Sequence, residues 1–340
     1  MKVAFVGKGG SGKTTLAALY ARHLEAEGRP VLAIDADINQ HLAVALGGPA
    51  HVATAMTPLG EHLGAIKEYL RGDNPRIRSA AEMVKTTPPG SGSRLLRVGE
   101  DNPIYAVCVR AVGGVRLAVT GEFTAEDLGV ACYHSKVGAV ELLLNHMLDG
   151  PGEYVVVDMT AGADSFASGL FTRFDRTFLI CEPTVRSVGV YRQYAGYARD
   201  YGVALSVIGN KVEDAADVEF LREHVGADLL AWVSRSAYVR RAERGTAGPL
   251  DELEAANRAV LGRVADTVDG TAQDWAAFTR WAHEFHRRNA VAWANERAGV
   301  DLTTQIDPEF RMGPQALGAP IPAPSGGTPP ARVDATSWLP

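Results

Sequence analysis

Residues 7–14, GKGGSGKT, restrict the fold of this chain more than any other stretch. They match the phosphate-binding pattern G-x-x-x-x-G-K-[ST] and lie between a short apolar run, 2–6, and a segment with helical spacing, 13–27. In such a loop the glycines turn backbone N–H groups toward a phosphate, and the helix N-terminus adds its dipole. The pattern therefore predicts a nucleotide site made by Gly9, Gly10, Ser11, Gly12, Lys13, Thr14 and Thr15. Lys13 is expected to pair with the β- and γ-phosphates, and Thr14 to hold Mg²⁺.

Further unbroken apolar runs alternate with helical segments along the chain. They occupy residues 31–34, 155–157, 178–180, 203–208 and 229–233. Continuous apolar strands separated by helices predict a doubly wound, mainly parallel sheet covered on both faces. Several of these runs end in carboxylates, namely Asp35 and Asp37, Asp158, and Glu182. Ligands bind outside the carboxyl ends of strands in such sheets, so these acids are expected at the site.

The remaining segments suggest one nucleotide-binding domain with additions. We expect the domain at 1–268, with a variable insertion at 49–100 that contains short helices and a mobile loop at the Gly/Ser run 90–93. Residues 104–119 predict a β-hairpin turning at Gly113-Gly114. A helical appendage is expected at 269–312, built on a helix over 274–298, and a disordered tail rich in Pro, Gly and Ala at 313–340.

The helix over 274–298 carries an aromatic stripe, at Trp275, Phe278, Trp281 and Phe285. One interpretation is that the stripe packs on the core of the nucleotide-binding domain. The other is a helix that binds a partner or a membrane, with arginines 280, 287 and 288 on its polar face.

Charge and cysteine content narrow the class of protein. The net charge of −6 and the pI of about 5.9 argue against a nucleic-acid binder. Three scattered cysteines argue against a disulfide scaffold and for a reducing compartment. The chain begins directly with the strand and loop, and no apolar run approaches the ~18 residues of a membrane span. We expect a soluble, cytoplasmic protein without a membrane or nucleic-acid partner.

A second lysine inside the loop, Lys8, points to a narrower group. The pattern K-G-G-x-G-K-[ST]-T resembles the deviant Walker A loop of the MinD/ParA/nitrogenase-iron-protein group of P-loop ATPases, of the SIMIBI type. The resemblance implies an ATP-dependent homodimer in which Lys8 reaches the partner's nucleotide. The alternative is that Lys8 serves its own nucleotide or faces solvent.

The same resemblance assigns roles to other residues. It implies that Asp35-Ala36-Asp37 is the first switch, where Asp37 activates the attacking water and Asp35 holds Mg²⁺ through water. Asp158, in VVVDMTAG, matches the Walker B aspartate, and Gly162 the glycine whose N–H senses the γ-phosphate. Asn210 and Lys211 stand where the group contacts adenine.

Three segments, VVVDMTAG, CEPTVRSVGV and IGNK, resemble most closely the CooC-like accessory ATPases of nickel insertion. That branch has a Cys-x-Cys pair whose two copies share a metal across the dimer. Here the matching place reads Cys132-Tyr133-His134. Thiolate and imidazole could bind Zn²⁺ or Ni²⁺ at the dimer interface, or Cys132 could be a packed core residue. Cys108 and Cys181 are expected to be structural.

The activity implied is slow, Mg-dependent ATP hydrolysis coupled to dimer formation. Three uses remain open at this point. The first is maturation of a client protein, including insertion of a metal cofactor. The second is positioning or partitioning of the ParA/MinD type, and the third is a regulatory ATPase that needs no further metal.

Overall fold

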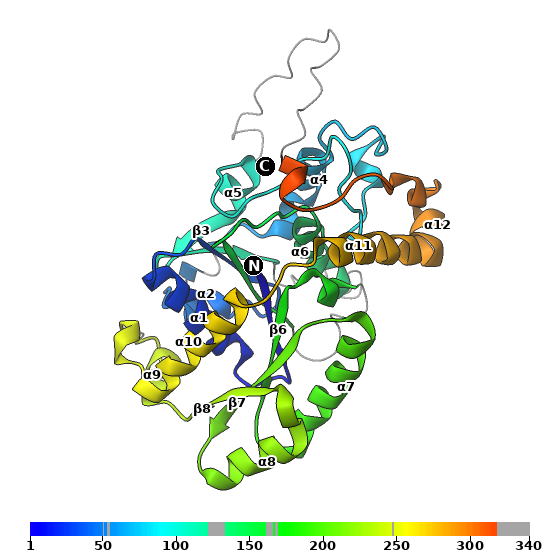
Figure 1. Cartoon of the computed structure of the whole chain (residues 1–340). Helices are drawn as coiled ribbons and strands as arrows, with labels where there is room; N and C mark the ends of the chain where they lie inside the picture. Colours follow the sequence, from blue (N-terminus) through cyan, green and yellow to red (C-terminus); the bar gives the residue numbers. More distant parts are fainter. Residues whose placement is uncertain are drawn as a thin grey trace.

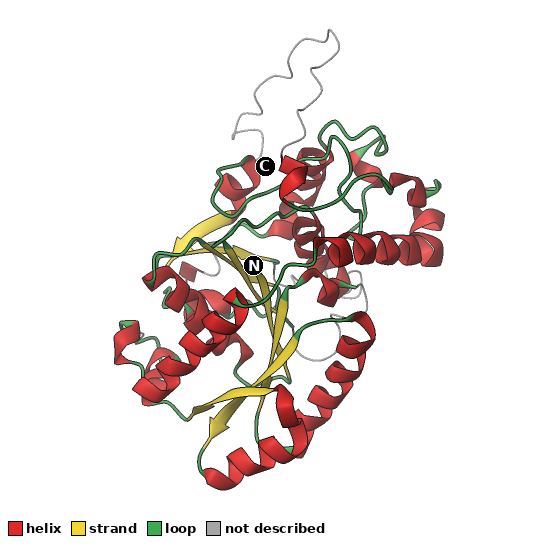
Figure 2. Ribbon diagram, in the orientation of Figure 1, coloured by secondary structure: helices red, strands yellow, loops and turns green. Residues whose placement is uncertain are grey.

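A computed structural model describes residues 1–317, apart from residues 50, 53–54, 122–132, 161–165, 167–168 and 247, and gives only the backbone at 133–136 and 317. The described residues form one sheet with helices on both faces (Figures 1 and 2). The strands are β1 (Lys2–Gly7), β2 (Val31–Asp35), β3 (Val109–Val112), β4 (Val115–Val119), β5 (Tyr154–Asp158), β6 (Arg176–Cys181), β7 (Leu205–Val212) and β8 (Leu229–Ser234). The doubly wound α/β fold predicted from the sequence is confirmed.

Strand order explains why the acidic strand ends meet the loop. The order is β3-β4-β2-β5-β1-β6-β7-β8, and all pairs are parallel except β3 with β4. Strand β5 lies between β1 and β2, so Asp158 is in register with Phe5 on one side and Asp35 on the other. The chain reverses its direction of winding at β1, and the phosphate loop therefore opens at the switch point of the sheet.

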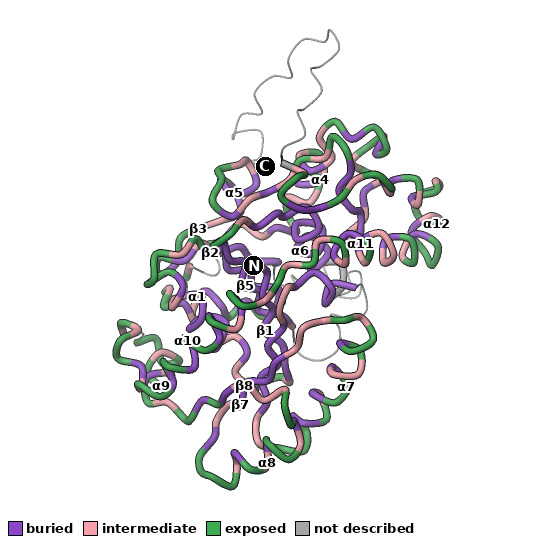
Figure 3. The backbone as a smooth tube through the Cα atoms, in the orientation of Figure 1, coloured by how far each residue is buried: buried purple, intermediate pink, exposed green. Residues whose placement is uncertain are grey.

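Alternate residues of the central strands feed two separate cores. Val3 and Phe5 join one core with the helices α1 (Lys13–Ala26), α2 (Leu42–Ala45), α9 (Ala237–Ala242) and α10 (Ala255–Asp269). Ala4 and Val6 join the other, with α4 (Leu63–Arg71), α5 (Pro103–Cys108), α6 (Tyr133–Asn145), α7 (Val185–Tyr201) and α8 (Ala215–Val225). Figure 3 shows the strands buried between the two layers. A sheet covered on both faces needs apolar residues at successive positions, which is why its strands read as continuous runs.

The predicted hairpin is correct only in its second part. Strands β3 and β4 pair and turn at Gly113 and Gly114, both at positive φ. Residues 103–108, however, form helix α5. Asn102 caps that helix by accepting a hydrogen bond from the Tyr105 N–H, and Pro103 occupies its first turn. Both are helix-start signals, and they outweigh the apolar run that suggested a strand.

The insertion at 49–100 contains α4 and two 3₁₀ turns, Leu59–His62 and Ala80–Glu82. The Gly/Ser run within it differs from the mobile loop predicted, because it contacts the C-terminal region. The N–H and the hydroxyl of Ser91 both donate to Asp307 Oδ2, at 3.0 and 2.7 Å. The insertion and the C-terminal region thus pack as one layer.

The C-terminal helix runs to residue 298 as predicted, through α11 (Trp275–Asn289), a π-helical segment (Ala290–Ala294) and α12 (Asn295–Ala298). Its aromatic stripe packs inward. Phe285 lies against Phe171 and Tyr201, and Trp281 has its ring centroid 5.0 Å from that of Tyr201. This supports the core-packing interpretation of the stripe. Among the described residues, no helix combines the length and apolar character that a membrane crossing requires. The tail at 318–340 lies outside the described residues.

Candidate nucleotide site

The loop between β1 and α1 has the backbone that the glycines were expected to allow. Gly12 has φ +97° and leads directly into α1. A Cβ added there would lie 2.2 Å from Asn210 Nδ2, and one at Gly7 would lie 2.7 Å from the Ile180 carbonyl oxygen. The Ser11 N–H donates to the Lys8 carbonyl at 3.0 Å. A side chain at Gly7 would collide with the backbone of β6, whereas one at Gly12 would strain the backbone and displace the Asn210 amide.

A cleft of about 600 Å³ lies over this loop. Its lining includes most of the predicted phosphate-binding residues, with Asp37 opposite them; the loop and first-turn residues are Gly9, Gly10, Gly12, Lys13, Thr14 and Thr15. Ser11 is fully buried beneath. An adjoining hollow of about 200 Å³ is lined by Asn210 and Lys211 together with Ser234 and Arg235. The two hollows share the loop and the start of α1, an arrangement that suits a ligand with a phosphate end and a flat polar end.

Lys13 is already paired inside the cleft. Its Nζ lies 3.2 Å from Asp37 Oδ2, and both side chains are about one-tenth exposed. Asn39 fixes the other oxygen, Oδ1, by donating from its side-chain amide at 2.8 Å and from its backbone N–H at 3.1 Å. A phosphate that binds Lys13 would therefore have to displace Asp37 from it.

Asp35 is fully buried and shapes the turn that carries Asp37. Its Oδ1 accepts from the Asp37 N–H at 3.1 Å, and its Oδ2 from the Leu42 N–H at 2.8 Å. Burial and the charge of Asp158 raise the pKa of Asp35 well above its ordinary value. Backbone hydrogen bonds from the turn only partly offset that cost.

Asp158 is the least satisfied acid of the site. It is fully buried, and neither carboxylate oxygen forms a well-aligned hydrogen bond with any described residue. Burial raises the pKa of Asp158 to about 7, against the opposing effects of Lys13 and the Thr14 hydroxyl. Free carboxylate oxygens beside a hydroxyl are the donors that Mg²⁺ prefers, so these residues fit the cation implied by the loop.

Asn210 and Lys211 lie inside β7 rather than after it, at a register shift against β8. Lys211 has φ +60°, which is uncommon for a residue with a side chain. Asn210 Nδ2 donates to the Ser11 carbonyl at 2.7 Å, and Lys211 Nζ donates to the Gly10 carbonyl at 2.6 Å. Both predicted base-contacting residues thus also brace the phosphate loop.

The sequence predicted Glu182 at the site without a specific role, and the structure places it beside Lys8 of the loop and Lys211 of β7. Its Oε1 accepts from Lys211 Nζ at 2.6 Å, and its Oε2 lies 3.7 Å from Lys8 Nζ. Lys8 also donates to the Gly9 carbonyl at 3.3 Å. The position of Glu182 at the carboxyl end of a buried strand was the one available signal.

The proposed metal ligands Cys132 and His134, and the switch residue Gly162, cannot be placed. Cys132 and Gly162 lie outside the described residues, as does the side chain of His134. In the part of the chain that is described, no three His, Cys, Asp or Glu side chains are grouped to hold a metal. Zn²⁺ and Ni²⁺ therefore have no support here. Cys108 and Cys181 are buried, as expected of structural cysteines.

Comparison with known proteins adds independent information. The model of the CobQ/CobB/MinD/ParA nucleotide-binding domain matches residues 3–269. The carbon monoxide dehydrogenase accessory protein CooC of Rhodospirillum rubrum is 32% identical over 246 residues, covering 72% of this chain and 87% of CooC. An uncharacterized ATP-binding protein of Methanocaldococcus jannaschii is 30% identical over 250 residues, covering 72% and 88%.

Solved structures agree on the fold. The cell-division ATPase MinD of Pyrococcus furiosus superposes with a TM-score of 0.51 at 17% identity, covering 79% of this chain and 98% of MinD. A putative plasmid partition protein of Borrelia burgdorferi, bound to AMPPNP, gives 0.51 at 13% identity, covering 78% and 96%. At these identities the likeness extends to the fold alone.

Proposed function

The chain belongs to the CobQ/CobB/MinD/ParA nucleotide-binding family of ATPases, and from that membership we propose that it is an ATP-driven, dimerising switch that acts on a client protein. Binding of ATP and its hydrolysis in general follow from the family. The proposal adds the residue roles, dependence on Mg²⁺, slow turnover, the homodimer and the client.

The Lys13–Asp37 ion pair is the observation that carries the proposal. ATP brings a γ-phosphate that binds Lys13 more strongly than one carboxylate does, because it presents several charged oxygens. Asp37 is then released while Asn39 still holds its Oδ1. A carboxylate freed beside the γ-phosphate can orient and deprotonate the attacking water. Nucleotide binding and activation of the base are in this way one event.

Thr14 and Asp158 would hold Mg²⁺, and Asp35 would support them through water. The ion would neutralise charge on the β- and γ-phosphates. The unsatisfied oxygens of Asp158 supply the physical reason, since a buried carboxylate without donors is costly until a cation joins it. Asp35 contributes mainly by fixing the turn before Asp37.

The base of ATP would occupy the smaller hollow, where the side chains of Asn210 and Lys211 lie. Lys8, about one-third exposed at the rim of the loop, would leave Glu182 and bind phosphates in a second copy of the chain. By the resemblance of its motif, the Gly162 N–H would sense the γ-phosphate. The role of Lys8 would make association of two chains depend on bound ATP.

For the client we propose a protein that the switch helps to mature, because CooC is named as an accessory protein of carbon monoxide dehydrogenase. Cys132 and His134 could supply a shared Zn²⁺ or Ni²⁺ site in that role. Capture of a metalloenzyme by an ATP-locked dimer in its native host would support this use. Capture of DNA or membrane instead would favour a ParA/MinD-type role, and capture of a metal-free regulator would favour signalling.

Turnover of ATP in two variants tests the residue roles. Lys13→Ala should lose nucleotide binding, because the γ-phosphate loses its main counter-charge. Asp37→Ala should bind ATP with Mg²⁺ but hydrolyse it at a small fraction of the wild-type rate, because only the base is missing. Wild-type turnover in Lys13→Ala would refute the site, whereas wild-type turnover in Asp37→Ala would refute only the assignment of the base.

A further inference from the structure

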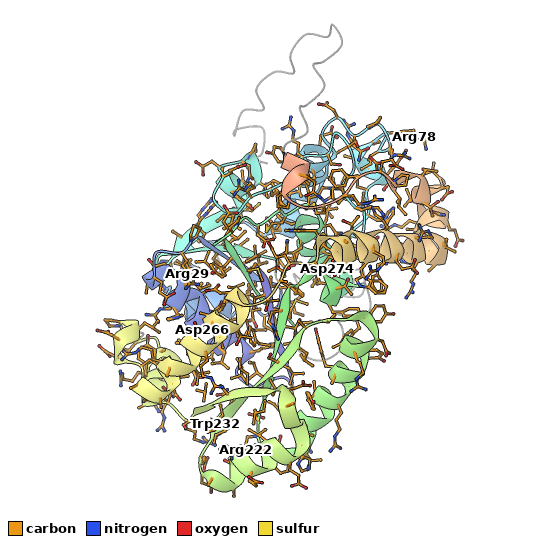
Figure 4. All side chains as sticks on the ribbon, in the orientation of Figure 1. Arg29, Arg78, Arg222, Trp232, Asp266 and Asp274 are labelled. Carbon is orange, nitrogen blue, oxygen red and sulfur yellow. The ribbon has the colours of Figure 1, made fainter. Side chains whose placement is uncertain are left out.

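A third hollow, of about 320 Å³, lies on the opposite face of the sheet from the nucleotide cleft and shares no lining residue with it. Its walls come from α4, from residues 81–85, from Gly138 of α6 and from the end of the C-terminal helix. Figure 1 shows α4 and α12 at the same end of the molecule, and Figure 4 labels Arg78 there. We call it the cationic hollow, after Lys67, Lys85 and Arg297 in its lining.

Positive charge in the cationic hollow is poorly compensated. Its lining holds one carboxylate, Glu82, which already pairs with Arg78 outside it at 3.4 Å. No carboxylate among the described residues lies within 4.0 Å of the charged nitrogens of Lys67 or Arg297. Lys67 and Arg297 line the same hollow, and burial together with the charge of Arg297 lowers the pKa of Lys67. Such an arrangement is relieved by an anionic ligand.

An exposed aromatic side chain lies beside these charges. Trp293, 40% exposed, lines the hollow, and Val291, 72% exposed, precedes it by two residues. Both belong to the π-helical segment Ala290–Ala294, whose Ala290 and Ala294 are buried against Leu302. Short π-helical segments are uncommon and are often found at functional sites. Here the segment buries its first and last alanines and leaves Val291 and Trp293 exposed.

Buried hydrogen bonds hold the two walls together. His286 Nε2 lies 2.9 Å from the Leu302 carbonyl oxygen, and its Nδ1 lies 3.2 Å from Thr86 Oγ1. Thr87 Oγ1 donates to Gln305 Oε1 at 3.0 Å. The insertion and the C-terminal region are therefore cross-linked directly behind the hollow. A preformed site loses little entropy when its ligand binds.

We propose that the cationic hollow binds a short acidic segment of a partner protein, with its carboxylates on Lys67 and Arg297 and an apolar side chain against Trp293. Charge complementarity requires the acid, and the exposed Trp293 in the lining favours an apolar neighbour on the same ligand. A small free anion would satisfy the cations but leave Trp293 uncovered. A basic and aromatic hollow with a rigid wall is typical of peptide recognition.

Part of the cationic hollow lies outside the family domain. The family domain matches residues 3–269, whereas Trp293 and Arg297 follow that range. Partner choice would then depend on an element added to the ATPase, separate from the nucleotide chemistry. The inference does not rest on the proposed dimer or on the client argued above, because it uses no residue of the nucleotide site.

Binding of short labelled peptides to the full chain, measured by fluorescence anisotropy, tests the proposal that the cationic hollow recognises an acidic segment. The probe places glutamates on both sides of one phenylalanine, and its matched control has glutamines in their place. We expect the acidic peptide to bind about tenfold more tightly than the control, a difference of about 1.4 kcal/mol. The double substitution Lys67→Gln and Arg297→Gln should remove that preference, and Trp293→Ala should weaken binding of both peptides.

Two control variants separate this site from general surface effects. Arg280→Gln removes an exposed cation from the same helix, and Val185→Ala removes an exposed apolar side chain elsewhere. Neither should change binding, and ATP binding should be unchanged in every variant, which verifies folding. The proposal is overturned if no acidic peptide binds, if the glutamine peptide binds equally well, or if the Lys67/Arg297 variant binds like the wild type. Citrate that binds through Lys67 and Arg297 and excludes the peptide without any effect of Trp293→Ala would also overturn it.

Discussion

Replacing Glu182 by glutamine should make ATP-dependent association of the chain easier. In the isolated chain Glu182 holds Lys8 at 3.7 Å and Lys211 at 2.6 Å. In the proposed dimer Lys8 leaves Glu182 and binds phosphates of the partner's nucleotide. Glu182 therefore stabilises the dissociated state by the free energy of the contact that must be broken. Glutamine keeps the size of the side chain and removes the charge.

The magnitude follows from the geometry of the Lys8 contact. Two unit charges 3.7 Å apart interact by about 4–5 kcal/mol at an effective dielectric constant of ~20. Lys8 is 36% exposed, and pairs of this kind contribute only ~1 kcal/mol in practice because water competes for the ammonium. A dimer breaks the contact twice, which gives about 2 kcal/mol, or a roughly 30-fold larger association constant.

Sedimentation over a range of protein concentrations, with a non-hydrolysable ATP analogue, measures that constant. Glu284→Gln is the matched control, because Glu284 also bridges two cations, Arg287 at 3.0 Å and Arg288 at 2.7 Å, but lies on α11 and lines neither nucleotide hollow. It should associate like the wild type. Association of Glu182→Gln that is equal to or weaker than the wild type would refute the reasoning.

Two further predictions concern buried acids and the proposed interface metal. Because the pKa of Asp158 is about 7 in the folded chain and near 4 when unfolded, nucleotide-free protein should lose stability as pH rises from 4 to 7. In urea unfolding, Asp158→Asn should lose up to about 4 kcal/mol less over this range, and the loss that remains comes from Asp35, whose pKa is also raised by burial. A parallel pH dependence in the variant would contradict the assignment. If Cys132 and His134 share a metal across the dimer, elemental analysis should find one Zn²⁺ or Ni²⁺ per two chains, lost in Cys132→Ser and in His134→Ala. Cys108→Ser should keep the metal, since burial raises the pKa of that thiol to about 12. A metal-free wild type that takes up neither Zn²⁺ nor Ni²⁺ would refute the hypothesis of a shared metal.

The nucleotide site could be predicted from the sequence because its signals are local. Eight adjacent residues, 7–14, specify the loop, and the acids follow apolar runs whose parallel pairing brings their carboxyl ends to one edge. The prediction of a strand at residues 104–108, where the structure has helix α5, was wrong. Asn102 and Pro103 are helix-start signals, but an apolar run beside a glycine turn is also typical of a hairpin. The apolar run favoured a strand and the capping residue favoured a helix, and the helix formed.

Features made by distant segments could not be predicted in this way. The link between Glu182 and Lys8 depends on the pairing of β1 with β6, which no short motif contains. The cationic hollow combines residues from 63 to 298, and each of its lysines alone reads as a solvated surface charge. The contact of Ser91 with Asp307 likewise joins a predicted mobile loop to the C-terminal region, 216 residues further along the chain.

The central claim is that ATP joins two chains through Lys8. Light scattering of the wild type and of Lys8→Ala, each with and without a non-hydrolysable ATP analogue and Mg²⁺, tests it most directly. We predict that the analogue converts the wild type from monomer to dimer. Lys8→Ala should bind the analogue, since Lys13, Thr14 and the loop amides remain, yet stay monomeric. A Lys8→Ala chain that dimerises at the same analogue concentration as the wild type would contradict the account.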